Sequence, residues 1–304
     1  MIDSRGNPFE VPGRWLRVNL HAHTTRSDGH MSPVDVAAWY WMHDYCVLAL
    51  TEHEHLFEEE IPNTPPDKLL LPGVETTWKL GDGHEVDVLI LGTTAMVKHL
   101  LQLAQSRART LNSLQHLLEK ARQVGAFTIL AHPRWSNLDP KLVSAFSNCG
   151  AFEIYTHCAE LENRTGFSVE YWERALIEGY RLWGVATDDS HGDLPDLGGG
   201  WIYLKTDEIN VTSILEALRL GWFYASNGAE FHDIRVGKGH VVVSADSEAT
   251  ISIVLDNREK REFRISAASG KVEARIPQTV RFVRIQCRTK SGKFAWTNPI
   301  FVGD

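Results

Sequence analysis

Two histidines and an aspartate stand close together near the start of the chain, in the stretch LHAHTTRSDGHMSP. His21 and His23 directly follow an apolar run, and residues i and i+2 of a β-strand point to the same face. Two imidazoles held side by side with Asp28 nearby could chelate a metal ion. A His-x-His motif on its own is more often two polar residues at a strand end, so a metal site needs further ligands elsewhere.

Further ligand-type side chains follow later apolar runs. They lie in the motifs TEHEH with His53 and His55, PGVE with Glu75, AHPRW with His132, and ATDDSH with Asp188, Asp189 and His191. In a barrel of parallel strands the carboxyl ends of all the strands open onto one face, where βα-barrel active sites form. Imidazoles and carboxylates without cysteine suit zinc, manganese or iron. The set exceeds what one ion needs, so we expect a carboxylate that bridges two ions, which points to hydrolysis.

The elements that would position these residues are short apolar runs that alternate with amphipathic segments. We expect strands at 16–20, 46–50, 69–74, 86–91, 127–130, 151–155 and 182–185, and helices at 32–44, 98–124, 169–178 and 211–220. Strands that alternate with helices predict parallel βα units, and hence a layered α/β or barrel architecture. The glycines of DLGGGW, at 196–201, predict a flexible loop.

The pattern changes after about residue 228. Short alternating runs such as HVVVSAD, TISIVLD and VRFVRIQCR follow, separated by polar and glycine residues and without a helical period. We therefore predict two domains, a hydrolase barrel at 1–228 and a small all-β, sandwich-like domain at 229–304.

Composition narrows the classes of partner. The chain has 304 residues, of which 43% are hydrophobic and 23% charged, which is typical of a globular protein. A net charge of -8 argues against broad binding to nucleic acid or to anionic lipid. The four cysteines form no Cys-x-x-Cys motif and are expected to be free thiols, and neither a signal peptide nor a membrane span is visible. We expect a cytoplasmic protein without a membrane partner, and its oligomeric state, including a homo-oligomer, stays open.

The motifs HAHTTRSDG, TEH, GVE, AHP and DDSH, in this order, resemble those of the PHP (polymerase and histidinol phosphatase) superfamily. The resemblance covers about residues 17–192. It continues more loosely through LGGGWIYL and ILEALRLGWFYASNG, as in a branch of the superfamily with a C-terminal β domain. The resemblance implies a distorted (β/α)7 barrel whose open end carries up to three metal ions, and phosphoester hydrolysis as the activity.

The resemblance also implies a set of metal ligands. These are His21, His23, Glu75 and Asp189 for a first ion, Glu75 and His132 for a second, and Asp28, His53 and His191 for a third. Many members carry another histidine shortly before a Leu-Gly pair, but the matching stretch here, DVLILG, has none. His84 lies further upstream and is either the replacement ligand or a loop histidine, and in the second case the cluster would be binuclear.

Three other residues beside the ligand positions could act on a substrate. Arg26 and Arg134 flank ligands, and a guanidinium can bind a phosphate through two hydrogen bonds. His157 could donate a proton to the leaving group. The alternatives are solvated arginines and an ordinary polar histidine. Asp188 is expected beside the ligands rather than among them, because the Asp-x-His pattern of the superfamily selects Asp189.

Together these features predict a metal-dependent phosphoesterase. A metal-bridging hydroxide at two or three divalent ions (Zn, Mn or Fe) would cleave a phosphomonoester or phosphodiester, and the partner would be a small phosphorylated molecule. The same hydroxide could attack a carbonyl, so a carboxylic-ester, amide or carbamate hydrolase is an alternative. A non-catalytic metal-binding module is a further alternative.

Overall fold

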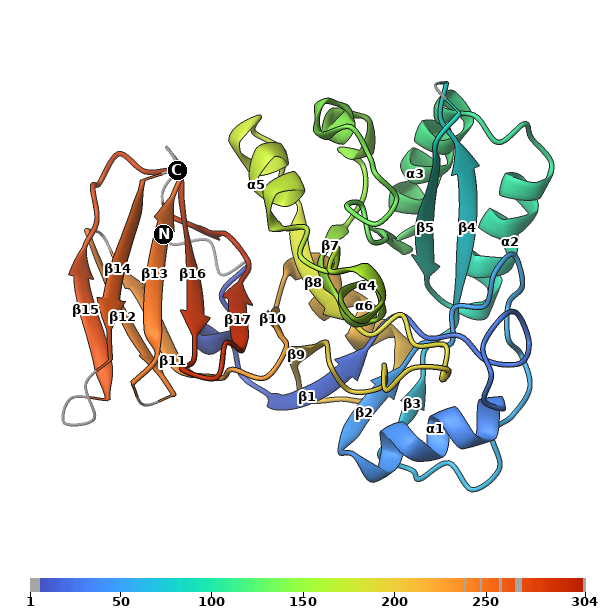
Figure 1. Cartoon of the computed structure of the whole chain (residues 1–304), viewed down its shortest axis with the longest axis horizontal. Coiled ribbons are helices and arrows are strands. Elements are labelled where there is room, and N and C mark those ends of the chain that lie inside the picture. Colours follow the sequence, from blue (N-terminus) through green and yellow to red (C-terminus); the bar gives the residue numbers. More distant parts are fainter. Residues whose placement is uncertain are drawn as a thin grey trace.

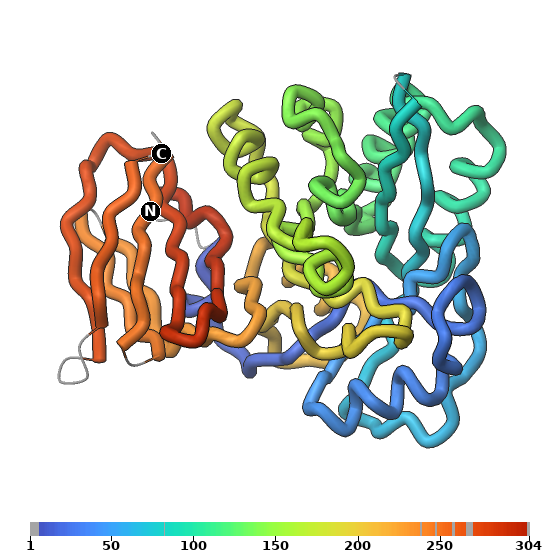
Figure 2. The backbone as a smooth tube through the Cα atoms, in the orientation of Figure 1, coloured from blue at the N-terminus to red at the C-terminus, as the bar shows by residue number. Residues whose placement is uncertain are grey.

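The computed structural model describes residues 6–302, apart from 82, 238, 247, 257–258 and 266–269. A mixed α/β body lies beside a β-rich part made of the C-terminal strands (Figure 1). Figure 2 shows the N-terminal strand, in blue, running from the β-rich part into the α/β body. In the described ranges no helix has the length and apolar character needed to cross a membrane.

The elements follow one another in a largely alternating order. The helices are α1 (Pro33–Met42), α2 (Thr94–Gln105), α3 (Leu111–Val124), α4 (His157–Asn163), α5 (Val169–Ile177) and α6 (Val211–Leu220), with short 3-10 helices at Pro8–Glu10 and Pro140–Phe146. The strands of the α/β body are β1 (Arg14–Asn19), β2 (Tyr45–Leu48), β3 (Leu69–Leu70), β4 (Gly73–Lys79), β5 (Glu85–Leu91), β6 (Phe127–Leu130), β7 (Ala151–Thr156), β8 (Trp183–Thr187), β9 (Trp201–Thr206) and β10 (Phe223–Ser226). The C-terminal strands are β11 (Phe231–Gly237), β12 (His240–Ala245), β13 (Thr250–Leu255), β14 (Lys260–Arg264), β15 (Lys271–Arg275), β16 (Phe282–Arg288), β17 (Phe294–Thr297) and β18 (Ile300–Phe301).

The strands of the α/β body form two sheets that meet at the ligand motifs. β1, β2 and β3 pair in parallel, and β9 and β10 continue this sheet with antiparallel pairing. The second sheet has the order β4-β5-β6-β7-β8, and within it β6, β7 and β8 are parallel. Two isolated parallel bridges, Ala22 with Ser190 and His53 with Glu75, join the sheets. A mixed α/β fold with several sheets is therefore confirmed, whereas the distorted (β/α)7 barrel is not.

The segment from 69 to 91 departs from the expected pattern of parallel strands. The run expected at 69–74 divides into β3 and β4, and β4 pairs with β5 as an antiparallel hairpin. Pro72 lies between the two strands, and a proline lacks the N–H that a continuous ladder needs. The hairpin turn contains Gly83, whose φ of 90° strongly favours glycine.

The single long helix expected at 98–124 is two helices. α2 ends at Gln105, and α3 begins after Thr110, whose side chain accepts a hydrogen bond from the backbone N–H of Ser113. A threonine in this position satisfies one of the free N–H groups at a helix start, so it begins a new helix rather than continuing the old one. α3 ends at Val124, where the sequence predicted the end of the helix, and Gly125 caps it with φ 83°.

The C-terminal strands form a β-sandwich that shares a sheet with the α/β body. β11, β12 and β15 form one layer, while β13, β14, β16, β17 and β18 belong to the long sheet that continues through β10 to β1. Apolar side chains of both layers fill one core, onto which Phe9 and Trp15 also pack. The pairing of β10 with β17 carries the sheet across the boundary predicted near residue 228. The boundary itself stays a prediction.

Asn298 ties the C-terminal strands to the α/β body. Its fully buried amide accepts a hydrogen bond from the N–H of Gly184 at 2.9 Å and donates to the carbonyls of Gly221 and Phe223 at 3.3 and 3.1 Å. We expect Asn298→Ala to lower the free energy of unfolding by about 2 kcal/mol, because three buried backbone groups lose their partner. Urea denaturation would measure the change. Asn112→Ala, at an exposed site on α3, is the control, and equal stability of the two variants would contradict this role.

Candidate metal centre

The predicted ligands lie where the two sheets meet. His21 and His23 follow β1, His53 follows β2, Glu75 lies within β4, His132 follows β6, and Asp189 and His191 follow β8. Among the described residues, four groups of side chains have ligand atoms that lie within 4.8 Å of one another, and three of these groups contain two or more of the predicted ligands. The three groups are His21, His23, Glu75 and Asp189; His23, Asp28, His53 and His191; and Glu75, Asp87 and His132; the fourth is Cys158, His191 and Asp196.

The first group has the spacing of a coordination site. Its four ligand atoms are Nε2 of His21, Nε2 of His23, Oε2 of Glu75 and Oδ1 of Asp189, and their recorded separations are 3.0 to 3.2 Å. Nitrogen and oxygen ligands bound tetrahedrally at about 2.1 Å lie about 3.4 Å apart. All four residues are buried. The group therefore fits a single divalent cation at its centre.

Glu153 determines which nitrogen of His21 faces this group. Nδ1 of His21 lies 2.8 Å from Oε1 of Glu153, so a neutral His21 carries its proton there and presents a lone pair at Nε2. That lone pair faces the carboxylate oxygens of Glu75 and Asp189. Electron-rich atoms in such close contact repel one another unless a cation lies among them, as protons on the imidazoles or as a metal ion.

The second group is more open to solvent. Asp28 lies at its centre, with Oδ2 at 3.3 Å from Nε2 of His53 and at 3.5 Å from Nε2 of His191. The ring of His23 is stacked between these two imidazoles, at centroid distances of 4.6 and 4.5 Å. Nδ1 of His23 lies 3.5 Å from Oδ1 of Asp28, while its Nε2 faces the first group, so Asp28, His53 and His191 are the ligands that belong to this group alone among the first three.

Glu75 connects the first group to the third. While its Oε2 faces His21 and His23, its Oε1 lies 3.3 Å from Nε2 of His132. Asp87 lies beside them, with Oδ2 at 3.9 Å from the same nitrogen and with a buried Oδ1 that has no hydrogen-bond partner in the described part of the chain. An unpaired buried carboxylate oxygen is costly without a cation. The two oxygens of Glu75 thus have the placement expected of a bridging ligand.

His84 does not join these groups. It is exposed beside the β4–β5 turn, where its carbonyl accepts a hydrogen bond from the N–H of Leu80 at 2.7 Å. The structure instead places Asp87, the first residue of DVLILG, beside Glu75 and His132. A metal ion at this place would bind a carboxylate rather than the histidine that the sequence analysis sought upstream. The feature of the sequence that could have indicated Asp87 is the presence of an acidic residue inside an apolar strand.

The imidazoles hold protons strongly in this environment. Burial alone would lower the pKa of His23, but hydrogen bonds to Asp189 and Glu75 outweigh it and raise the pKa to about 10. Burial would also lower the pKa of His132. The hydrogen bond to Glu75 and the charge of Asp189 outweigh burial and raise this pKa to about 9. Protons and divalent cations compete for the same nitrogens. The buried carboxylates of this site therefore stabilise positive charge, whether it is carried by protons on the imidazoles or by metal ions.

Asp188 lies outside the ligand groups, and its carboxylate faces the loop at 198–200. Its carboxylate accepts hydrogen bonds from the N–H groups of Gly198, Gly199 and Gly200 at 2.7 to 2.8 Å and from Tyr40 Oη at 2.7 Å. Burial raises the pKa of Asp188 to about 7, although these hydrogen bonds lower it. The segment predicted to be a flexible loop is thus fixed onto a buried acid.

The three consecutive glycines are a steric requirement of this contact. A Cβ atom added at Gly199 would lie 2.0 Å from the ring of His157, and one added at Gly200 would lie 2.3 Å from the carbonyl oxygen of Thr187. Gly198 has φ 82°, which favours glycine. A side chain in this stretch would push the backbone N–H groups away from Asp188.

The three groups open into a cavity of about 270 Å³. It is lined by Asp28, His30, His53, Glu75, His132, Trp135, Cys158, Glu162, Asp189, His191 and Asp193. Neither Arg26, Arg134 nor His157 lies among these described lining residues. As far as the structure describes it, the lining contains acids, imidazoles, a thiol and an indole but no lysine or arginine.

The three residues expected to contact substrate have other partners. Arg26 forms an ion pair with Glu59, and Arg134 pairs with Glu170 at 2.7 Å. Since a guanidinium that already binds a carboxylate is less available to a phosphate, neither is a free clamp in this arrangement. His157 lies 2.9 Å from Tyr155 Oη, and burial lowers its pKa. Their catalytic roles stay predictions.

Comparison with known proteins identifies relatives by structure. No protein-family model and no curated protein matches the sequence. A solved structure from Bacteroides vulgatus, described as a two-domain protein containing a predicted PHP-like metal-dependent phosphoesterase, matches with a TM-score of 0.51 and 14% identity, covering 97% of this chain and 99% of that one. An amidohydrolase from Chromobacterium violaceum with bound sulfate and no metal matches with a TM-score of 0.41 and 17% identity. The match covers 59% of this chain and 89% of that one. A protein from Bifidobacterium adolescentis matches with a TM-score of 0.42 and 14% identity, and its assignment as a metal-dependent phosphoesterase is itself a proposal. The match covers 69% of this chain and 98% of that one.

Fold and site together define a mixed α/β protein with a β-rich C-terminal part and a cluster of histidine and carboxylate side chains at the junction of two sheets. The chain shares its fold with the Bacteroides structure, since the match spans nearly the whole of both chains. The resemblance drawn from the sequence motifs is thus confirmed at the level of the fold.

In the third ligand group, Asp87 rather than His84 is expected to bind the metal ion beside Glu75 and His132. We expect Asp87→Ala to lower the metal content by about one ion per chain, because His132 and Glu75 alone leave too few ligands for that ion. His84→Ala is the matched control and should keep the content of the wild type. Elemental analysis of protein purified without chelator would measure both. Loss of metal in His84→Ala but not in Asp87→Ala would contradict the assignment.

Glu153 was missed by the sequence analysis because it lies inside the apolar strand β7. Besides His21, it accepts hydrogen bonds from Thr187 Oγ1 at 2.7 Å, Thr156 Oγ1 at 2.9 Å and the N–H of His132 at 2.8 Å. A carboxylate that orients a ligating histidine typically contributes about 10- to 100-fold to metal affinity. We therefore expect Glu153→Gln to weaken metal binding by that factor in competition with a coloured chelator, and Glu162→Gln, at the cavity rim, to leave it unchanged. Equal affinities in the two variants would exclude this positioning role.

Proposed function

We propose that this protein is a metal-dependent hydrolase that cleaves phosphoesters of small molecules at a cluster of two to three divalent cations. The observation that carries the proposal is the buried carboxylate of Glu75, one oxygen of which faces His21 and His23 while the other faces His132. Adjacent cation sites that share a carboxylate are the arrangement of two-metal hydrolases. Zinc, manganese and iron all suit the nitrogen and oxygen ligands.

Bound cations would supply an activated water and positive charge for the oxygens of the scissile group. The residues of the chain have separate tasks. Glu153 orients His21, and the loop at 198–200 holds Asp188 beside Asp189. Trp135, whose side chain is 46% exposed, and Glu162, which accepts its indole N–H at 2.8 Å, form part of the cavity wall. These contacts limit how a substrate enters and how it is oriented.

A carboxylic-ester, amide or carbamate hydrolase is the second candidate, and a specific observation favours it. The described cavity lining has no lysine or arginine, while Glu162 and Asp193 add negative charge. A doubly charged phosphomonoester would depend entirely on bound cations for compensation, whereas a phosphodiester or a neutral ester needs less. Among phosphoesters, we therefore expect phosphodiesters to be preferred.

A side-by-side assay tests the proposal. Metal-loaded wild type, His53→Ala and the control His99→Ala, at an exposed site on α2, would be given 4-nitrophenyl phosphate, bis(4-nitrophenyl) phosphate and 4-nitrophenyl acetate. We expect the diester to be cleaved fastest, with a loss of at least about a hundredfold in His53→Ala because a ligand of the cluster is removed, and no loss in His99→Ala.

The other outcomes are equally informative. Cleavage of the acetate alone, with the same dependence on His53, would replace the phosphoesterase by the carbonyl hydrolase. Metal uptake without cleavage of any substrate in a broad panel would favour the non-catalytic metal-binding module. Activity that survives both His53→Ala and complete chelation would refute the metal-dependent mechanism.

A further inference from the structure

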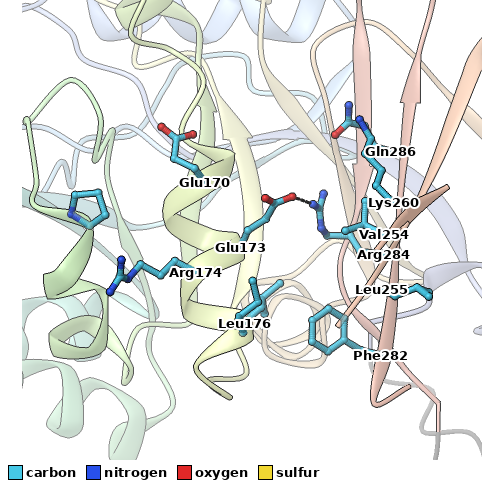
Figure 3. Close-up of a pocket in the computed structure, with 12 residues that line it drawn as sticks. Glu170, Glu173, Arg174, Leu176, Val254, Leu255, Lys260, Phe282, Arg284 and Gln286 are labelled. Carbon is cyan, nitrogen blue, oxygen red and sulfur yellow. Dashed lines mark hydrogen bonds and ion pairs between the residues drawn. The ribbon is translucent and has the colours of Figure 1, made fainter. Parts of the chain in front are cut away.

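A second cavity lies between the two parts of the molecule and shares no described lining residue with the metal centre. Figure 3 shows it with α5 on one side and strands of the C-terminal sheet on the other. Its volume is about 560 Å³, within the range of small-molecule sites. Leu176, Val254, Leu255 and Phe282 give it an apolar wall.

Arg284 is the unusual member of this cavity. Its side chain is only 1% exposed, and its guanidinium lies 4.9 Å from the ring centre of Trp172. One nitrogen, Nη2, pairs with Glu173, as the dashed line in Figure 3 marks, but Nη1 has no hydrogen-bond partner among the described residues. A buried guanidinium N–H without an acceptor is costly, because a charged donor has lost water and gained nothing.

The pair that Arg284 forms with Glu173 is unequal. The side chain of Glu173 is 41% exposed and can turn toward solvent, whereas Arg284 is enclosed. The remaining charged groups of the cavity already have partners on the surface. These pairs are Glu170 with Arg134 at 2.7 Å, Arg174 with Glu178 at 3.0 Å and Lys260 with Glu262 at 2.9 Å. Among the described charged groups of the cavity, the buried donor that lacks an acceptor is therefore Nη1 of Arg284.

We propose that this cavity binds a small organic carboxylate with an apolar body, and that the carboxylate takes the place of Glu173 on Arg284. A guanidinium and a carboxylate match in shape and can form two parallel hydrogen bonds, which would use both Nη1 and Nη2. The apolar wall would cover the rest of the ligand. Glu173 acts as an internal competitor that covers the arginine when no ligand is present.

Calorimetric titration of the metal-loaded protein with 4-phenylbutyrate and with its neutral amide tests this site. We expect the carboxylate to bind and the amide to bind at least about tenfold more weakly, because the hydrogen bonds to a charged group are lost. Arg284→Met should weaken carboxylate binding by a similar factor. Glu173→Gln should instead strengthen it severalfold, since the competing carboxylate is gone. Glu216→Gln removes an exposed acid of α6 outside the cavity and should change nothing.

The opposite signs expected for the two cavity variants separate this site from binding elsewhere. The proposal is overturned if neither the wild type nor Glu173→Gln binds the carboxylate detectably. It is also overturned if the wild type, Arg284→Met and Glu173→Gln bind the carboxylate with the same affinity. If circular dichroism shows that Arg284→Met does not fold, Glu173→Gln decides alone. Its substitution lies at a half-exposed position, and unchanged or weaker binding there also overturns the proposal.

Discussion

Buried negative charge at the junction of the two sheets is the constraint on which the rest of the site depends. Glu75, Glu153 and Asp189 are all buried, and a carboxylate removed from water costs several kcal/mol unless donors or cations compensate it. Glu153 is compensated by hydroxyls, an imidazole and a backbone N–H. Glu75 and Asp189 face imidazoles instead, so their compensation depends on protons or metal ions. Folding of this region and occupation of its cation sites are therefore linked.

The same junction holds strained backbone. His132 has φ 27° and Asp189 has φ 55°, and positive φ in residues other than glycine costs on the order of 1 kcal/mol or more. Hydrogen bonds hold both residues in place, since the N–H of His132 donates to Glu153 at 2.8 Å and the N–H of Asp189 donates to the carbonyl of His21 at 3.0 Å. Strain and ligand placement are thus stabilised by one set of contacts.

The ligands that end strands could be read from the sequence, because a polar residue directly after an apolar run marks the open end of a strand. Glu153 and Asp87 could not be read in this way, since each is a single acid inside an apolar run, where no local pattern shows which partners compensate it. The glycines at 198–200 were misleading for a different reason. Glycine permits both mobility and close approach of the backbone, and only the buried Asp188 shows that close approach is the reason here. The β4–β5 hairpin likewise depends on pairing that apolar periodicity does not specify.

The C-terminal strands form part of the frame of the site. Without them β10 would lose its pairing with β17 and become an edge strand, and Phe9 and Trp15 would lose the core on which they pack. The same strands hold α5 through the pair of Arg284 with Glu173. Ser168, which directly precedes α5, in turn accepts the N–H of Arg134 at 3.2 Å, two residues after His132. A continuous series of contacts thus connects the β-sandwich to a residue of the cluster, so removal of the sandwich would leave this ligand loop with less support.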